Sequence, residues 1–135
     1  MGGLRGVKVL LDTHALLWAL AEPDQLGDHA RATISDPTCD LTVSAATAWE
    51  LSTKARLGTL PGAAAILNSY QRQLARLGAT ELQMTSEHAL LAGSLDWIHR
   101  DPFDRMLAAQ ALLEGLPLVT RDPAFTSLDG LRLIW

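Results

Sequence analysis

The sequence predicts an α/β fold built around a parallel sheet. Short apolar runs, typical of buried parallel strands, alternate along the chain with longer segments of helical spacing. The chain has 135 residues, of which 48% are apolar, and it contains neither an internal repeat nor a low-complexity linker. This is enough apolar material for one well-buried core. Residues 1–135 are therefore predicted to form a single domain.

Five short apolar segments are predicted to be strands. The first is interrupted only by Lys8 and is flanked by Gly6 and Asp12, and all five are too short to be helices. Because helical segments separate the successive strands up to residues 118–120, the strands are expected to pair in parallel. They are expected at residues 7–11, 41–43, 82–84, 118–120 and 131–134.

Six helices are predicted between these strands, and local signals mark where they begin and end. Pro23 ends the first helix, and Ser44 is a good N-cap for the third. Gly58 and Gly78 stand where two helices stop, and Pro102 occupies the first position of the last one. The helices are expected from residue 15 to Pro23, at 28–34, from Ser44 to Gly58, from Pro61 to Gly78, from Ser86 through Leu91, and from Pro102 to Gly115.

Four acidic residues lie where a parallel sheet gathers functional groups. Asp12 follows the first strand directly, and Asp122 follows the strand at 118–120. Glu50 belongs to the helix that leaves the second strand, and Asp104 to the first turn of the helix at Pro102. Ligands of open parallel sheets bind at the carboxyl ends of the strands. We therefore expect the four carboxylates to converge on one edge.

Each of these acids also has a purely local explanation. Asp12 is a suitable N-cap for the helix that follows it, and Asp104 can simply face the positive end of its helix dipole. Glu50 fits a capping-box spacing with Thr47, although Ser44 is the better helix start. Asp122 resembles the opening of a turn. Three separate strand ends, however, place an acid at the same rim. Clustered carboxylates raise one another's pKa unless a cation neutralises them, and Mg²⁺ is the natural cation for oxygen ligands.

Four segments of the chain resemble the PIN-domain nucleases, and within them the VapC toxins of bacterial toxin–antitoxin pairs. The resemblance implies a three-layer α/β/α fold with a five-stranded parallel sheet. It assigns catalysis and metal binding to Asp12, Glu50, Asp104 and Asp122, with the metal held chiefly by Asp12 and Asp104. The matching segments occur in the family's order and are LLDTHALLW (10–18), SAATAWE (44–50), HRDPFDR (99–105) with AAQA (108–111), and VTRD (119–122).

Three further residues are implied to support the acids. Thr120 and Asp101 would orient an acid or a bound water, and Thr13 is a weaker candidate for the same task. For Asp101, a plain role as a helix N-cap remains open.

The resemblance implies hydrolysis of RNA phosphodiester bonds by a magnesium-dependent ribonuclease, with Mn²⁺ able to substitute. It also implies a protein antitoxin as partner and a homodimer. The chain has one cysteine, Cys39, and hence no disulfide within the chain, which suits the cytoplasm. No apolar run is long enough to span a membrane.

The net charge of −4 speaks against RNA binding by bulk electrostatics. A bound metal would offset the carboxylates, and several basic residues lie close in sequence to the acids. Lys54 and Arg56 are among them, and Arg100, Arg105 and Arg121 are candidates for RNA contacts. Taken singly, each of these residues is better explained as a solvated charge.

The remaining polar and aromatic residues are interpreted as structural. No pair of histidines has the spacing of a metal site, so these residues are interpreted as structural or surface groups: His14, His29, His88 and His99. Trp18 and Trp49 fall among apolar helical positions and are expected in the core.

Three other functions are compatible with parts of the pattern. A phosphotransferase of the haloacid dehalogenase type needs a second acid two positions after Asp12, where this chain has His14. A receiver-type signalling domain needs paired acids near the first strand and a lysine near the last, which are not evident. A catalytically silent PIN-like module that binds RNA or an antitoxin is the third alternative, and the complete set of acids argues against it.

Overall fold

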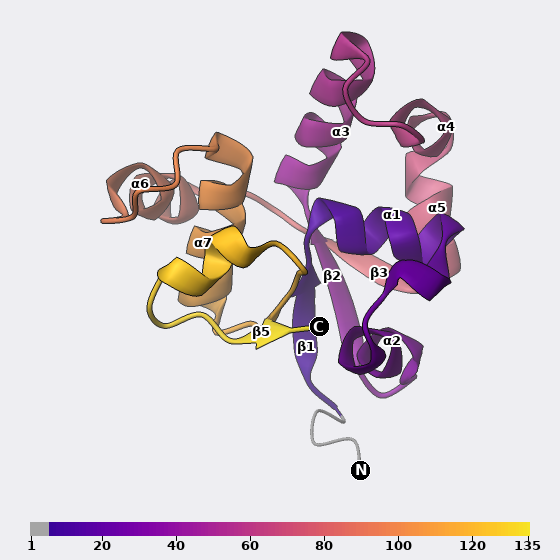
Figure 1. The fold of residues 1–135 in the computed structure, drawn as a ribbon, viewed down its shortest axis with the longest axis horizontal. Coiled ribbons are helices and arrows are strands. Elements are labelled where there is room, and N and C mark those ends of the chain that lie inside the picture. The colour runs from indigo at the N-terminus through magenta and orange to yellow at the C-terminus, as the bar shows by residue number, and fades with distance from the viewer. Residues whose placement is uncertain (1–5) are drawn as a thin grey trace.

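The computed structural model describes residues 6–135, so residues 1–5 of the predicted single domain lie outside the described part. Five strands form one parallel sheet in the order β3-β2-β1-β4-β5, which confirms the predicted fold class (Figure 1). The strands are β1 (Lys8–Leu11), β2 (Asp40–Ser44), β3 (Ala79–Leu82), β4 (Leu118–Val119) and β5 (Leu133–Ile134).

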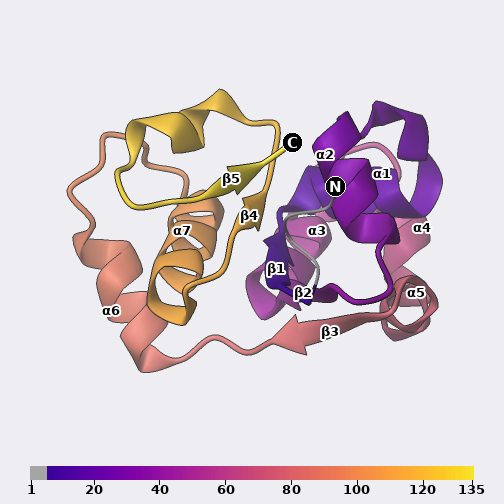
Figure 2. The same cartoon turned by 90° about the horizontal axis from the view of Figure 1, so that it is seen from below.

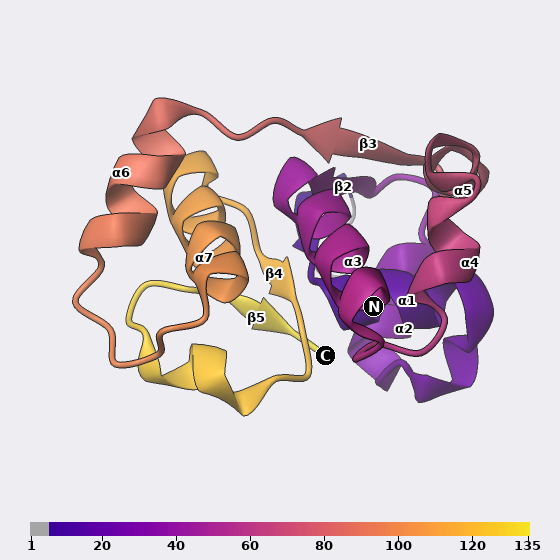
Figure 3. The ribbon, with the colours of Figure 1, turned by 90° about the horizontal axis from the view of Figure 1, so that it is seen from above.

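The helices form two layers on opposite faces of the sheet. Helices α6 and α7 lie on one side, and α1, α2, α4 and α5 lie on the other, with α3 rising between the two groups from the end of β2 (Figures 1 and 3). No helix within residues 6–135 is long and apolar enough to cross a membrane. The helices are α1 (Thr13–Ala21), α2 (Asp28–Ser35), α3 (Ala45–Leu57), α4 (Ala63–Leu67), α5 (Tyr70–Leu77), α6 (Ser86–Ser94) and α7 (Pro102–Glu114), with 3₁₀ turns η1 (Pro23–Gln25) and η2 (Pro123–Ser127).

The central strand β1 is buried on both faces. Val9 and Leu11 belong to the core shared with α1 to α5, whereas Leu10 belongs to a second core that includes Leu107 of α7 and Phe125 of η2. Because side chains alternate across a strand, a strand covered on both sides must be apolar at successive positions. This is why residues 9–11 read as a continuous apolar run.

The structure differs from the predicted elements between residues 61 and 86. The helix predicted from Pro61 to Gly78 is two helices, α4 and α5, because the backbone of Ser69 is not helical (φ −146°, ψ 44°). The strand predicted at 82–84 lies at Ala79–Leu82, starting directly after the left-handed Gly78. Thr85 rather than Ser86 caps α6, since the Thr85 hydroxyl accepts from the His88 amide.

The end of the sheet is fixed to α2 by a close approach at Gly27. The amide of Ala30 donates to the carbonyl oxygen of Trp135 over 2.9 Å, and Figure 2 shows the C-terminal end of the chain beside α2. A Cβ atom added at Gly27 would lie 2.4 Å from the same carbonyl oxygen. The backbone there is ordinary (φ −65°), so it is the space against Trp135 that requires glycine.

The variant G27A should therefore lower the free energy of unfolding by about 1–3 kcal/mol, since overpacking forces the backbone to shift. The matched control is G93A in α6, where an added Cβ meets no atom within 4 Å. That variant should be neutral or stabilise by up to about 1 kcal/mol, because alanine favours helix over glycine. Urea unfolding of both variants measures the difference. Equal stability of G27A and wild type would contradict the tight contact.

Candidate active site

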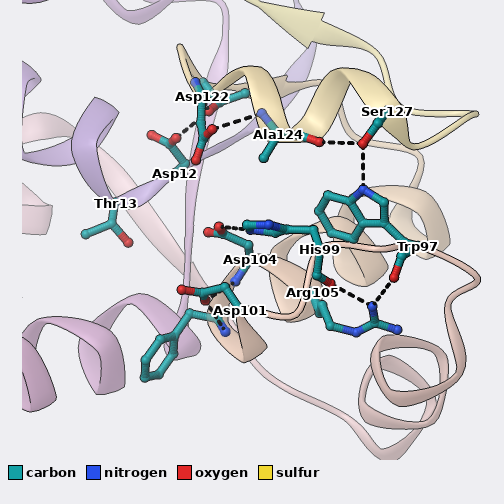
Figure 4. Close-up of polar contacts among 12 residues, drawn as sticks. Asp12, Thr13, Trp97, His99, Asp101, Asp104, Arg105, Asp122, Ala124 and Ser127 are labelled. Atoms are coloured by element: carbon teal, nitrogen blue, oxygen red, sulfur yellow. Dashed lines mark hydrogen bonds and ion pairs between the residues drawn. The ribbon is translucent and has the colours of Figure 1, made fainter.

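A pocket of about 480 Å³ opens at the carboxyl ends of the strands and contains all four predicted acids. Figure 4 shows the carboxylates of Asp12, Asp104 and Asp122 directed toward the same space, with Asp101 beside them. Two cationic side chains, Lys54 and Arg121, also line it. Five carboxylates against these two cations make the pocket strongly acidic; they are Asp12, Glu50, Asp101, Asp104 and Asp122.

Asp12 is fixed at the end of β1 by three hydrogen bonds. Its amide donates to Val119 over 3.0 Å, its Oδ1 accepts from the Ala15 amide over 2.8 Å, and its Oδ2 accepts from the Thr120 hydroxyl over 2.5 Å. Burial raises the pKa of Asp12 to about 6, and the charges of Glu50 and Asp122 add to this rise, although the hydrogen bonds from the Thr120 hydroxyl and the Ala15 amide oppose it. Asp12 thus caps α1 and lines the pocket at once.

Glu50 lies in the second turn of α3, where Ser44 provides the cap. The Thr13 hydroxyl donates to its Oε1, and the Lys54 ammonium contacts its Oε2 at 2.5 Å. Burial alone would lower the pKa of Lys54, but the hydrogen bond and charge of Glu50 outweigh burial and raise it. Lys54 therefore stays charged and balances the buried glutamate.

Asp104 lies in the first turn of α7, which begins at Pro102. Asp101 caps this helix by accepting from the amides of Phe103 and Asp104 over 2.9 and 3.0 Å. The Oδ2 atom of Asp104 lies 2.7 Å from Nε2 of His99. Burial raises the pKa of Asp104 to about 6, the charges of Asp101 and Glu50 raise it further, and His99 opposes the rise.

Asp122 and Thr120 connect the end of β4 to Asp12. The Thr120 hydroxyl accepts from the Asp122 amide over 3.0 Å while donating to Asp12. The Asp122 carboxylate accepts from the Ala124 amide over 2.9 Å and so caps η2. The Thr120 hydroxyl group therefore links the two pocket residues Asp12 and Asp122.

The basic residues near the acids have different environments. Arg121 lines the pocket, with its guanidinium 4.5 Å from the centre of the Trp18 ring. Arg105 instead donates to four backbone carbonyls, which gives it a structural role rather than the RNA contact expected of it. Arg100 is exposed and does not line the pocket. Of the three predicted RNA-contact arginines, only Arg121 is a pocket residue.

Two residues, His99 and Trp49, lie in environments that differ from those predicted for them. His99 belongs to the pocket, whereas His88 is buried and pairs with Glu114 at 2.9 Å, a structural role as expected. Trp49 is 56% exposed and packs edge-on against Phe103 with ring centres 4.8 Å apart, so it is not a core residue. His99 precedes α7, where helical spacing gives no signal that it contacts Asp104.

The donor set of the pocket fits a hard divalent cation. No three His, Cys, Asp or Glu side chains within residues 6–135 form a ready-made metal-binding group. Mg²⁺, however, is commonly held by one or two carboxylates, with water and phosphate oxygens as its other ligands. Asp12 and Asp104 supply such carboxylates, and the pKa of each is raised to about 6, as expected for acids that a cation would neutralise.

Comparison with known proteins identifies one family and several structures of the same fold. The model of the PIN domain family matches residues 9–131. No curated protein matches the chain significantly. Among solved structures, DNA-bound VapBC from Salmonella typhimurium is similar at 21% identity, covering 94% of this chain and 96% of that one, with a TM-score of 0.70.

Two further structures share this fold. VapBC2 from Rickettsia felis, bound to a promoter DNA fragment, is 16% identical over 94% of this chain and 96% of that one, with a TM-score of 0.66. VapBC-5 from Mycobacterium tuberculosis, a member of the VapBC family of toxin–antitoxin systems, is 20% identical over 94% and 97%, with a TM-score of 0.62. At these identities the likeness establishes the fold.

The raised pKa of Asp12 predicts how stability depends on pH in the absence of metal. Between about pH 4 and pH 6 the folded protein keeps a proton on Asp12 that the unfolded chain has released. The contribution of this proton to the free energy of unfolding is therefore complete below pH 4 and is lost as the pH rises through 6. Asp12→Asn removes this titration. The free energy of unfolding of wild type should fall relative to D12N by on the order of 2–3 kcal/mol over this interval. Urea unfolding in EDTA measures it, and parallel profiles would contradict it.

Proposed function

The chain belongs to the PIN-domain family, and from this we propose that it is a divalent-metal-dependent ribonuclease, the toxin of a toxin–antitoxin pair. The observation that carries the proposal is the convergence of four acids in one pocket. They come from the ends of β1 and β4 and from the helices α3 and α7. Local capping alone would not require these carboxylates to line a common space.

The pocket acids are the proposed metal-binding and catalytic groups. Asp12 and Asp104 would hold the ion, with Glu50 and Asp122 as further acids of the same site. Mg²⁺ is the proposed ion, and Mn²⁺ can substitute. When bound, the ion stabilises the charge that builds on the phosphate oxygens and makes water a better nucleophile. The chain itself supplies the rigid placement of the carboxylates.

The residues around the acids orient them for this reaction. Thr120 holds one oxygen of Asp12, and Thr13 holds one oxygen of Glu50. Asp101 sets the first turn of α7, on which Asp104 lies. These contacts fix carboxylate orientations before substrate arrives, which is how a preorganised site lowers a barrier.

The acidic pocket explains how a protein with a net charge of −4 can act on RNA. Without a cation the excess of carboxylates repels phosphate, so substrate binding and metal binding are coupled. Arg121 is the proposed phosphate contact, because it lines the pocket and its guanidinium is held over the Trp18 ring. RNA is expected to enter as a single-stranded segment, where the backbone is accessible.

We further propose a protein antitoxin and a homodimer as the assemblies of this chain. The support for the antitoxin is the similarity to VapBC structures, one of them described as a member of a family of toxin–antitoxin systems. The chain also exposes large apolar side chains that a partner would cover. On α3 these are Trp49 and Leu57, which are 56% and 58% exposed.

Purified protein should cleave RNA in Mg²⁺ or Mn²⁺ and lose this activity in EDTA. D12N and D104N should each reduce the rate at least about 100-fold, since both remove a charged metal ligand. D129N, which changes an exposed acid outside the pocket, should cleave like wild type. Circular dichroism checks that all variants fold. RNA binding without cleavage in any divalent ion would instead indicate the silent PIN-like module.

Arg121→Ala should weaken RNA binding and its dependence on salt. Loss of one phosphate contact should lower the slope of log affinity against log salt by about 0.7 for single-stranded RNA. R72A is the control, because Arg72 is an exposed α5 residue that does not line the pocket. Fluorescence anisotropy with labelled RNA over a salt series measures the slope. An unchanged slope for R121A would contradict the phosphate contact.

A further inference from the structure

We propose that His99 is a positioning residue that holds the Asp104 carboxylate in the orientation needed to bind the metal ion, and that Arg105 fixes the preceding loop for this purpose. This inference rests on the proposed metal-dependent function.

The first support is the contact between His99 and Asp104. Nε2 of His99 lies 2.7 Å from Oδ2 of Asp104, and both side chains line the pocket (Figure 4). An ionised carboxylate can only accept, so the imidazole donates this hydrogen bond. His99 engages one carboxylate oxygen and leaves Oδ1 for a cation. Both side chains are mostly buried, with 28% and 19% of their surface exposed, so solvent competes little for the bond.

The second support is that the imidazole ring is held from behind. The Trp97 ring packs against His99 with 4.9 Å between ring centres. Trp97 is itself fixed, because its indole Nε1 donates to the Ser127 hydroxyl over 2.9 Å and its ring packs on Phe125. Figure 4 shows this chain of contacts running from η2 to Asp104. Trp97 therefore supports one side of the His99 ring while the opposite end of the imidazole contacts the carboxylate.

The third support is the way Arg105 holds the backbone of the same loop. Residues 95–101 have no helix or strand of their own, so other contacts must fix them. Arg105 follows Asp104 directly on α7. Its guanidinium donates over 2.7–2.9 Å to the carbonyls of Ala92, Leu95, Trp97 and His99. The first turn of α7 thus carries both Asp104 and the residue, Arg105, that fixes the backbone of His99.

The arrangement matches how the other two buried acids are held. Asp12 receives a hydrogen bond from Thr120, and Glu50 receives one from Thr13. Asp104 accepts the corresponding hydrogen bond from the side chain of His99. Hydrogen bonds to metal-binding carboxylates fix their orientation, and removing such a partner typically lowers metal affinity 10- to 100-fold. His99 completes this set of donors.

The test measures Mn²⁺ binding in the absence of RNA. The electron paramagnetic resonance signal of free Mn²⁺ reports how much of the ion remains unbound. H99F keeps a ring to pack on Trp97 but lacks the donor, and H99Q keeps an amide donor. H99F should bind Mn²⁺ at least about tenfold more weakly than wild type, and H99Q should retain most of the affinity. H29A removes an exposed histidine of α2 as the matched control and should bind like wild type.

A second readout separates positioning from direct ligation. Electron spin echo measurements on Mn²⁺-loaded wild type should show no coupling to an imidazole nitrogen, because His99 acts through Asp104. Wild-type affinity in folded H99F, or a nitrogen coupling that disappears in H99F, would overturn the inference while leaving the ribonuclease proposal intact. Absence of both Mn²⁺ binding and cleavage in wild type would overturn the two together.

Discussion

The parallel pairing of β1 with β4 is the constraint on which the pocket depends. It brings Asp12 beside Thr120, 108 residues apart in the chain, through the backbone bond from the Asp12 amide to Val119 and the side-chain bond from Thr120 to Asp12. Parallel strands are joined by crossover helices, so their carboxyl ends all meet at one edge. The chain therefore delivers acids from separate segments to one place without any of those segments being close in sequence.

Helix capping and function are combined in the same side chains. Asp12, Asp101 and Asp122 each cap a helix or a 3₁₀ turn, and each also lines the pocket. A cap ties a carboxylate to backbone amides and thereby fixes its direction, while each carboxylate keeps lone pairs for a further partner. Local and functional explanations of these residues were therefore never exclusive alternatives.

The sequence predicted the sheet and the acids because both follow from local rules. A strand buried on both faces must be apolar throughout, and an acid directly after such a strand must lie at the sheet edge. The contact of His99 with Asp104 was not predictable, because it depends on a loop fixed by Arg105 and Trp97. The exposure of Trp49 and the break at Ser69 were missed because helical spacing reports periodicity and not which face is covered or where the backbone departs from a helix.

The acids that form the pocket also lower the stability of the fold. Burial and the charges of neighbouring carboxylates raise the pKa of Asp12 and Asp104 to about 6, so holding both ionised at neutral pH opposes folding. Thr120 and His99 each offset part of this effect with a hydrogen bond that favours the charged form of Asp12 and Asp104. Lys54 places its positive charge 2.5 Å from Glu50. A bound divalent cation would offset more. Because a ligand that binds only the folded state stabilises it, the ion proposed for catalysis would also stabilise the fold.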